Sequence, residues 1–480
     1  MNLLQNKPIK INTKNYICST FKNKNTMRKT AILSLLVLTS IVTSGQENMK
    51  KCITTRLVEQ ELISNPDYAK GRENVAIENT AWIKANHSEK TPLNIPVVIH
   101  IIHKNSHSNI GSGTNISNAQ IEDALRVLNE DYSKTNPEHP NPPRNTFLNY
   151  WGNPNMKFCL ATTDPSGNPT NGITRTSTTI TDWDADDNFE SNAMKKAVNG
   201  GIDAWNPSKY LNIWVCNLSN SNGGGMTLGY AYLPGLQSWN AWKDGLVIDF
   251  QYFGTIGGAS SSSDGRTATH EIGHYFGLMH TFCEDSDSQG NPICCDNDNN
   301  NWGGYVDDTP ATEDIYWGSV TSSTNNNTCN DLSYSNVFGN AVPPIDVLDM
   351  DENYMSYAST TWMFSTDQVN VMNATLNGYR SSLKNTTVSM NCEGSVGTGL
   401  NNYQLENLNI YPNPTLGKLN IASADKINTL SITNIIGKEL LFTKDFSAKT
   451  IDLSFYENGV YFINISTDKG THIEKIILIK

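Results

Sequence analysis

The stretch His270-Glu-Ile-Gly-His274-Tyr-Phe-Gly277-Leu-Met-His280 carries the most information about the fold. Two histidines four residues apart share one face of a helix, so both imidazoles can reach the same ion. Gly277 can adopt a positive φ, which would end the helix there. The turn would bring His280 back as a third nitrogen ligand. The stretch therefore predicts a helix that ends in a metal site.

Three nitrogen ligands favour a catalytic zinc ion over a structural one. Structural zinc sites are closed by four protein ligands, whereas catalytic sites keep one position for water or substrate. Zinc in such a site lowers the pKa of its water to about 7 and polarises a carbonyl group. We expect the three histidines to bind the zinc. Glu271, directly after the first of them, is expected to act as general base on the zinc-bound water.

Two other functions remain open. The first is a surface-binding or adhesion protein on a metal site that has lost catalysis, although the intact Glu271 argues against it. The second is a narrow peptidase or toxin with one target. Cleavage of a generic protein that a chelator abolishes would argue for the general endopeptidase.

A second stretch, Asn353-Tyr-Met355-Ser-Tyr357, follows the third histidine along the chain. Together with the histidine stretch it resembles the signature of the metzincin zinc proteases. The resemblance implies that Met355 underlies the metal and that Tyr357 stabilises the oxyanion of the transition state. Taken alone, Met355 could equally be an ordinary core residue.

Within the metzincins, residues from about 92 to 385 resemble the pappalysin family, in particular its ulilysin-like bacterial members. The segments that carry the resemblance are Ile95–Ile102, Asn115–Gln120, Phe158–Ala161, Leu211–Cys216, Leu228–Tyr232 and Gly265–His270. The resemblance implies an α/β (α+β) catalytic domain with a mixed twisted sheet and an active-site helix. It implies a zinc endopeptidase with a protein or peptide substrate, whose backbone pairs with a strand near Leu228–Tyr232.

Three further expectations rest on the same resemblance. Asp307, Asp308 and Thr309 are similar to a calcium-associated stretch, and hard Ca²⁺ prefers such oxygen ligands, although a solvated acidic turn is the alternative. Cys283 and Cys329 resemble a family disulfide. Cys52 resembles a cysteine that blocks the zinc in the latent precursor, although an unrelated free or bridged cysteine is equally compatible.

Departures from the family pattern leave two points open. The residues after Tyr357 (Ala-Ser-Thr-Thr) lack the acids with which some relatives prefer Arg or Lys after the scissile bond. The family cysteine expected after the Tyr357 stretch is missing, and the vicinal pair Cys294-Cys295 is additional. The full disulfide connectivity therefore cannot be read from the sequence.

The N-terminus has the pattern of an export signal. From Met27, the favoured start, two basic residues precede an apolar run over 31–42 and then small residues. A run of about a dozen residues is too short for a membrane span, which needs about 20, although a weak anchor is the alternative. We predict a leader and signal peptide over 1–45, a propeptide over 46–91 and the protease domain over 92–392. No stable membrane span is expected.

The C-terminal end differs in composition. Residues 393–404 form a predicted linker, and residues 405–480 contain short β runs without Cys or Trp, which predict an all-β sandwich. The tail resembles the C-terminal sorting domain of type IX secretion in Bacteroidetes through Leu408–Pro414, Gly417–Ile421, Gly459–Phe462 and Lys475–Ile479. The resemblance implies the secretion machinery as partner and a secreted or cell-surface location. A binding module for substrate or carbohydrate is the alternative.

Periodicity and charge agree with this organisation. Buried-strand patterns cover Ile95–Ile102, Lys157–Ala161, Leu211–Cys216 and Leu246–Phe253, and helices are expected from Ser117, between about 188 and 199, and from Ser365. This order suggests a mixed α/β core. The net charge of −12 sums a basic leader and an acidic remainder, since residues 1–45 hold seven basic residues and no acid. So acidic a body argues against nucleic acid as a partner.

Overall fold

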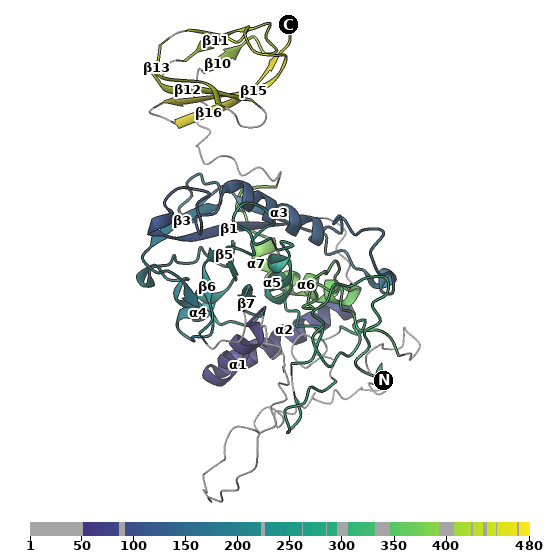
Figure 1. The fold of residues 1–480 in the computed structure, drawn as a ribbon. Coiled ribbons are helices and arrows are strands. Elements are labelled where there is room, and N and C mark those ends of the chain that lie inside the picture. The colour runs from purple at the N-terminus through teal and green to yellow at the C-terminus, as the bar shows by residue number, and fades with distance from the viewer. Residues whose placement is uncertain are drawn as a thin grey trace, which may run out of the picture. The chain divides into compact units, whose positions relative to one another are not determined.

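The protein is described here by a computed structural model (Figure 1). It describes residues 51–85, 92–221, 226–261, 263–284, 286–294, 306–331, 346–392, 408–423, 426–434, 439–447, 449–467 and 470–480. The chain divides into two compact units, residues 1–161 with 172–394, and residues 162–171 with 395–480. The predicted signal peptide and linker lie outside the described residues.

A mixed seven-stranded sheet forms the framework of the first unit (Figure 1). The strands run in the order β7-β8-β5-β1-β2-β9, and β3 pairs with the second half of β1. Strand β7 at the edge is antiparallel to β8, while β8, β5, β1 and β2 run parallel. The bounds are β1 Leu93–Lys104, β2 Met156–Ala161, β3 Ile173–Thr178, β5 Leu211–Cys216, β7 Gly229–Ala231, β8 Leu246–Asp249 and β9 Met390–Asn391; β4 Trp183–Asp184 and β6 Leu218–Ser219 pair separately.

The central strands are apolar on both faces, as strands of a covered parallel sheet are. Residues 95–102 of β1 and all residues of β5 are buried. The structure confirms the predicted strands, but the predicted strand Leu246–Phe253 is too long, because β8 ends at Asp249. The Asp249 carboxylate accepts hydrogen bonds from the backbone N–H groups of Leu218 and Gln251, which turns the chain at that point.

Helices pack against this sheet and carry the expected caps. The bounds are α1 Thr54–Ser64, α2 Pro66–Lys84, α3 Asn118–Tyr132, α4 Glu190–Ala193, α5 Thr267–Tyr275, α6 Thr366–Asn377 and α7 Ser381–Lys384. Ser117 caps α3 by accepting from the N–H of Gln120, and Ser365 begins α6 with a complete capping box. The helix predicted over about 188–199 is wrong in length. Only α4 and a 3₁₀ turn over Ala197–Asn199 form, since the chain turns at Lys195 to bury that side chain.

Helices α1 and α2 precede the sheet in sequence and belong to the first unit (Figure 1). Leu57 and Val58 of α1 and Tyr68 of α2 belong to the same buried cluster as Tyr230 in strand β7 and Tyr232 just after it. Helix α2 also packs against α6, where Asn79 donates a hydrogen bond to Thr375. Residues 51–85 are therefore an integral part of this folded unit.

The second unit is all β, as the sequence predicts. Two antiparallel sheets, β10-β11-β14 and β13-β12-β15-β16, enclose a core that includes Leu419, Leu430 and Ile463. The strands are β10 Asn409–Tyr411, β11 Lys418–Ala422, β12 Ile427–Asn434, β13 Glu439–Phe446, β14 Thr450–Asp452, β15 Gly459–Thr467 and β16 Gly470–Leu478. Among the described residues of both units, no helix has the length and apolar character to span a membrane.

Candidate active site

Helix α5 carries the first two histidines and ends where the sequence predicts. Gly277 has a φ of +106°, and the N–H of Leu278 donates across the turn to the carbonyl of Gly273 at 3.0 Å. This left-handed ending turns the chain back, as glycine at this position allows. His280 thereby reaches the two histidines of the helix. All three imidazoles are buried.

The ring nitrogens of these histidines converge on one point. Nε2 of His280 lies 3.2 Å from Nε2 of His270 and 3.1 Å from Nε2 of His274. Nδ1 of His270 donates to the carbonyl of Tyr354 and Nδ1 of His274 to that of Leu278, both at 2.7 Å. Because a carbonyl oxygen can only accept, both protons sit on Nδ1 and both Nε2 lone pairs face the point of convergence.

A zinc ion fits this arrangement. A tetrahedral zinc with Zn–N distances of about 2.0–2.1 Å separates its ligand nitrogens by about 3.3–3.4 Å. The distances of 3.1 and 3.2 Å found here are close to that value. Burial lowers the pKa of His270 and of His274 well below the usual value, with His280 adding to the effect, so both rings are neutral and able to bind a cation. Lone pairs that face one another this closely repel unless a cation lies between them.

The third histidine, His280, has a carboxylate and not a carbonyl next to its Nδ1 atom. Nδ1 of His280 lies 3.0 Å from the carboxylate oxygen Oε2 of Glu284. The hydroxyl of Thr55 in α1 donates to the same oxygen. A carboxylate behind a histidine raises its basicity as a ligand. The sequence reasoning missed Glu284, although its place four residues after His280 was a signal for it.

Met355 lies directly beneath the histidine helix. It is fully buried, and a Cβ at Gly273 would lie 2.4 Å from its sulfur Sδ. Only glycine at position 273 therefore lets this methionine approach the helix between the two ligands. The structure thus places Met355 under the site, where the resemblance implied it.

Glu271 points into the same space and is 1% exposed. Burial raises the pKa of its carboxyl to about 8. The Cys52 thiol donates a hydrogen bond of 3.4 Å to its oxygen Oε2. Sγ of Cys52 and the nearest nitrogens of the three histidines all lie within 4.8 Å of one another. The thiol therefore occupies the open side of the predicted metal site.

Tyr357 closes the site from the opposite wall. Its ring lies 5.0 Å from that of His280, and its hydroxyl meets the backbone of Cys52. The N–H of Cys52 donates to this hydroxyl at 3.0 Å, and the hydroxyl donates to the Cys52 carbonyl at 3.2 Å. The hydroxyl thus faces the peptide group of Cys52 beside the three histidines.

The segment that carries Cys52 lies along edge strand β7. Cys52 forms a parallel bridge with Gly229, and the N–H of Leu228 donates to the Lys51 carbonyl at 2.8 Å. The Thr54 hydroxyl donates to the carbonyl of Ala231 and accepts from its N–H. Strand β7, predicted to bind substrate backbone, thus pairs here with the chain's own residues 51–54. We call residues 51–85 the N-terminal segment.

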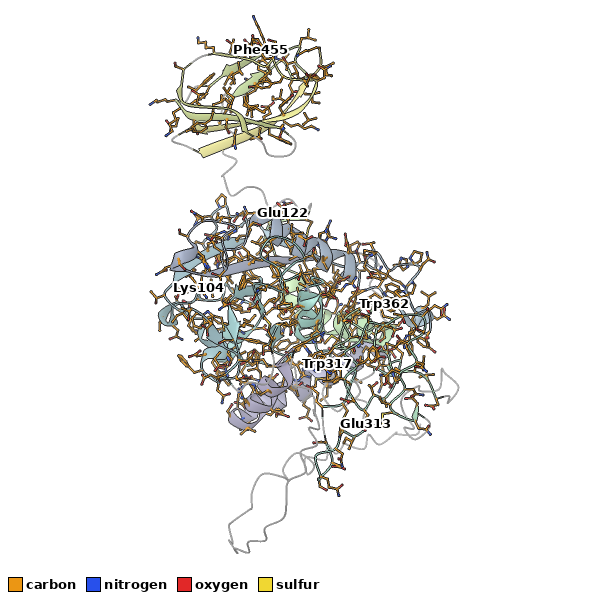
Figure 2. The ribbon with its side chains drawn as sticks, viewed as in Figure 1. Lys104, Glu122, Glu313, Trp317, Trp362 and Phe455 are labelled. Atoms are coloured by element: carbon orange, nitrogen blue, oxygen red, sulfur yellow. A yellow bond between two sulfur atoms is a disulfide. The ribbon has the colours of Figure 1, made fainter. Side chains whose placement is uncertain are left out.

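A cavity of about 330 Å³ opens beside Cys52. Its lining includes Met226, Leu228, Tyr252, Arg266, Trp317 and Ser359. The Lys51 side chain extends along it, donates to the carbonyl of Tyr357 at 2.7 Å and lies 5.6 Å from the ring of Trp317, which Figure 2 labels. The cavity adjoins the predicted metal site, since His270 and Glu271 also line it.

A buried polar network supports the first histidine from behind. The Tyr354 hydroxyl donates to Asp131 of α3 at 2.7 Å, and the Tyr354 carbonyl is the partner of His270. The Thr269 hydroxyl also donates to Asp131 at 2.7 Å, and Arg266 lies 3.4 Å from it. Burial raises the pKa of Asp131 to about 6 despite these partners. The sequence reasoning missed this network; its one signal was an aspartate on the apolar side of a predicted helix.

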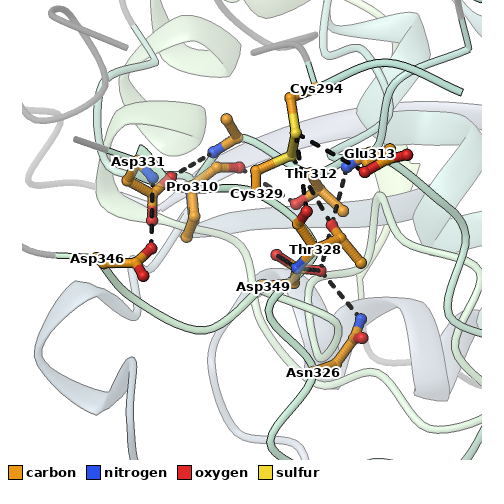
Figure 3. The surroundings of a disulfide bond; sticks show 11 residues. Cys294, Pro310, Thr312, Glu313, Asn326, Thr328, Cys329, Asp331, Asp346 and Asp349 are labelled. Carbon is orange, nitrogen blue, oxygen red and sulfur yellow. Dashed lines mark hydrogen bonds between the residues drawn. A yellow bond between two sulfur atoms is a disulfide. The ribbon is translucent and has the colours of Figure 1, made fainter. Parts of the chain in front are cut away.

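The predicted disulfide between Cys283 and Cys329 is wrong. Cys329 is bonded to Cys294, with a Cα–Cα distance of 5.7 Å (Figure 3). Cys283 takes part in a different disulfide, and its N–H is held by the carbonyl of Thr312. A further bridge joins Cys159 of β2 to Cys392, the residue after β9, across 233 residues. The cysteines that pair are those that the folded chain brings together, and their positions along the sequence did not identify them.

The three residues predicted to bind calcium differ in their surroundings. Asp308 and Thr309 are buried, and among the described residues neither Oδ1 of Asp308 nor Oγ1 of Thr309 has a hydrogen-bond partner. Oδ2 of Asp308 accepts from the N–H of Asp367 at 3.0 Å. Burial, with the charge of Asp367, raises the pKa of Asp308 to about 7. Asp307 is partly buried, and its N–H donates to Asp367.

Comparisons with known proteins show that the chain is similar to metalloproteases. Residues 193–377 match the family described as pregnancy-associated plasma protein-A, and residues 409–480 match the secretion system C-terminal sorting domain. An extracellular metalloprotease of Pyricularia oryzae is 31% identical over 227 residues, which are 47% of this chain and 59% of that protein. The chain thus spans about three fifths of that relative. One of Sordaria macrospora is 27% identical over 300 residues, 61% of this chain and 78% of that protein.

Solved structures extend the similarity. A mutant of promirolysin from Tannerella forsythia is 32% identical, with a TM-score of 0.54, and the match covers 70% of this chain and 97% of that one. Mature mirolysin in complex with a cleaved peptide is 34% identical, with a TM-score of 0.49, and covers 62% of this chain and 97% of that one.

Proposed function

Because the chain belongs to the pregnancy-associated plasma protein-A (pappalysin) family of metalloproteases, we propose that it is a zinc-dependent endopeptidase made as a latent precursor. The observation that carries the proposal is the convergence of three buried Nε2 atoms beside the carboxylate of Glu271. The C-terminal unit is a type IX secretion sorting domain, so the chain is a secreted or cell-surface protein.

His270, His274 and His280 would hold the zinc, which supplies Lewis acidity towards water and a substrate carbonyl. Glu271 accepts the proton of the attacking water and passes it to the leaving amine. The Glu271 carboxylate already accepts a hydrogen bond from the Cys52 thiol beside the three histidines, which places it within reach of a water at that position. The backbone contacts of β7 hold the peptide in an extended conformation.

Tyr357 would stabilise the oxyanion. Its hydroxyl already donates to a peptide carbonyl, that of Cys52, at 3.2 Å. When a substrate replaces the Cys52 segment, the same hydroxyl can donate to the oxygen on which negative charge develops. A donor aimed at that position lowers the barrier because the charge is larger in the transition state than in the substrate.

Cys52 would keep the precursor latent. Its sulfur takes the fourth position around the histidines, and its thiol engages Glu271. Hydrogen bonds of Lys51 and Thr54 to strand β7 fill the substrate path on either side. Removal of the segment would free the metal site, the general base and the edge strand in one step.

Substitution of the general base tests the proposal. The processed Glu271→Gln enzyme should retain stoichiometric zinc but lose peptide hydrolysis by about 10²–10⁴-fold, because the amide cannot accept the proton. A chelator should abolish wild-type activity and added zinc should restore it. Full activity of the variant would refute the mechanism. If the wild-type protein binds surfaces but cleaves no peptide, it is an adhesion protein. If it cleaves peptides but neither casein nor gelatin, it is a narrow peptidase.

A calcium site at Asp308 and Thr309 is part of the proposal. Two buried oxygen atoms without partners are costly unless a cation or water binds them. Millimolar Ca²⁺ should raise the melting temperature of the wild-type protein and not that of Asp308→Asn. An equal change in the melting temperature of both proteins would show that Asp308 binds no calcium and that the stretch is a solvated acidic turn.

A further inference from the structure

The loop between β4 and α4 holds an arginine of the N-terminal segment. Arg56 donates from Nη1 to the carbonyl of Asp186 at 2.9 Å and to Oδ1 of Asn188 at 3.3 Å, and from Nη2 to the carbonyl of Ala185. We call these three acceptors the arginine cradle. They suit a planar guanidinium, whose donors diverge in a fixed fork, better than a compact ammonium group.

The catalytic unit itself holds the cradle in place. The N–H of Ala185 donates to the carbonyl of Ser219 at 2.8 Å, and that of Trp183 to the carbonyl of Asn217 at 2.9 Å. The Asp184 carboxylate accepts from the N–H groups of Asp186 and Ser221. None of these bonds involves the N-terminal segment. The loop itself therefore holds the backbone carbonyls of Ala185 and Asp186, whereas the Asn188 side chain also accepts a hydrogen bond from Gln60 of the N-terminal segment.

The charge of the loop favours a cation. Five carboxylates lie within nine residues, and no Lys or Arg occurs from 176 to 194. The five are Asp182, Asp184, Asp186, Asp187 and Glu190. Such a field attracts a basic group and orients its approach. The observation that points to a ligand is the bound guanidinium of Arg56, not the acids alone.

The cradle lies within reach of the end of β7. Cys52 marks the metal site, Thr54 pairs with the last residue of β7, and Arg56 follows two residues later in the first turn of α1. The Arg56 side chain, and not an extended backbone, therefore spans the distance from the end of β7 to the cradle. An arginine side chain of a peptide that pairs with β7 can reach the cradle in the same way.

We propose that the arginine cradle is a substrate subsite, which binds an arginine side chain a few residues from the scissile bond once the N-terminal segment has left. The inference rests on the proposed peptidase function. Arg56 is then a mimic of the substrate arginine in the latent precursor.

Matched peptides test the subsite on the processed, zinc-loaded enzyme. Fluorogenic peptides would carry arginine, or its neutral isostere citrulline, at each position on either side of the cut bond. At one of the positions that do not adjoin the cut bond, arginine should give a kcat/KM about tenfold higher than citrulline. A tenfold ratio corresponds to one charge-assisted hydrogen bond. Asn188→Lys should bring this ratio close to one, and Asn188→Asp should increase it.

Controls separate the possible outcomes. Asn149→Lys makes the same charge change at an exposed site in another part of the unit and should keep the wild-type ratio. A ratio near one at every position in the wild-type enzyme would overturn the subsite, as would an arginine preference that Asn188→Lys leaves intact. If the enzyme cleaves the peptides without a preference for arginine, the subsite is wrong and the peptidase function is retained. If it cleaves no peptide, both the subsite and the peptidase function are wrong. Equal melting temperatures of the two lysine variants exclude misfolding as the cause.

Discussion

The thiol of Cys52 lies 3.4 Å from the carboxylate of Glu271, although 219 residues separate the two in the chain. The same sulfur faces the nitrogens of the three histidines. One side chain thus contacts both the proposed general base and the open side of the proposed metal site. Burial raises the pKa of this thiol, with Glu271 contributing, so only a cation at the histidines would stabilise the thiolate.

The first prediction concerns latency. In Cys52→Ala the metal position is open to water while the contacts of Lys51 and Thr54 still hold the segment in the cleft. We expect the uncleaved precursor to hydrolyse a short fluorogenic peptide at least about tenfold faster than the wild-type precursor, since a metal–thiolate bond is worth more than 1.4 kcal/mol.

Cys216→Ala is the matched control for this experiment. It removes the other cysteine that is free among the described residues, and it is buried in β5. The Cys216→Ala precursor should hydrolyse the peptide no faster than the wild-type precursor. If Cys52→Ala is equally silent while the processed enzyme is active, Cys52 is not the residue that blocks the site.

A second prediction concerns Tyr357. Tyr357→Phe keeps the ring between His280 and Phe282 but removes the hydroxyl that donates to a peptide carbonyl. Loss of an oxyanion donor costs about 10²–10³ in kcat with little change in KM, because the interaction is made in the transition state. Steady-state kinetics of the processed enzyme would show the split, and its zinc content should remain that of the wild type. A change confined to KM would assign Tyr357 to substrate binding alone.

A third prediction concerns the support of His270. In Tyr354→Phe the hydrogen bond to Asp131 is lost, so the backbone carbonyl that fixes the His270 tautomer is held less firmly. Outer-sphere partners of this kind change metal affinity by about 10–100-fold. We expect zinc affinity to fall by about tenfold, measured by competition with a chelator.

Tyr230→Phe controls for the loss of a buried hydroxyl. Its hydroxyl donates to the carbonyl of Ser191 and to no group around the histidines. Zinc affinity should be unchanged in this variant. Equal losses in both variants would mean that general destabilisation, and not the Asp131–Tyr354 pair, sets the affinity.

A fourth prediction concerns stability and pH. Burial lowers the pKa of Lys195 to about 7, and the ammonium donates to the carbonyl of Lys243 beside three aromatic rings. Between pH 7 and the pKa of the unfolded state, the unfolded chain binds more protons than the folded one. This group therefore makes the free energy of unfolding rise with pH, by about 2 kcal/mol between pH 7 and 9.

Lys195→Met tests this assignment, since methionine has a similar length and no charge. The pH-dependent rise should shrink by that amount relative to the wild type in denaturant titrations at pH 7 and 9. An identical pH dependence in both proteins would show that Lys195 keeps its charge when folded.

Local spacing explains how much of the site could be predicted. His270 and His274 lie on one face because 3.6 residues make one helical turn, and Gly277 ends the helix because it accepts a positive φ. The caps at Ser117 and Ser365 likewise involve residues three positions apart. The features that could not be predicted from the sequence have a different origin. The pairing of Cys329 with Cys294, the end of β8 at Asp249 and the network around Asp131 depend on contacts between distant segments.

By itself the sequence therefore determined the family resemblance, the all-β tail and the set of residues able to bind a metal and move a proton, because these follow from residue types at short, regular spacing. Only the tertiary structure decided that Cys52 meets Glu271, that Tyr354 links Asp131 to His270, and that Arg56 rests on the loop after β4. Such contacts arise when the sheet and its helices pack, and packing is set by the summed burial of many side chains rather than by any local pattern.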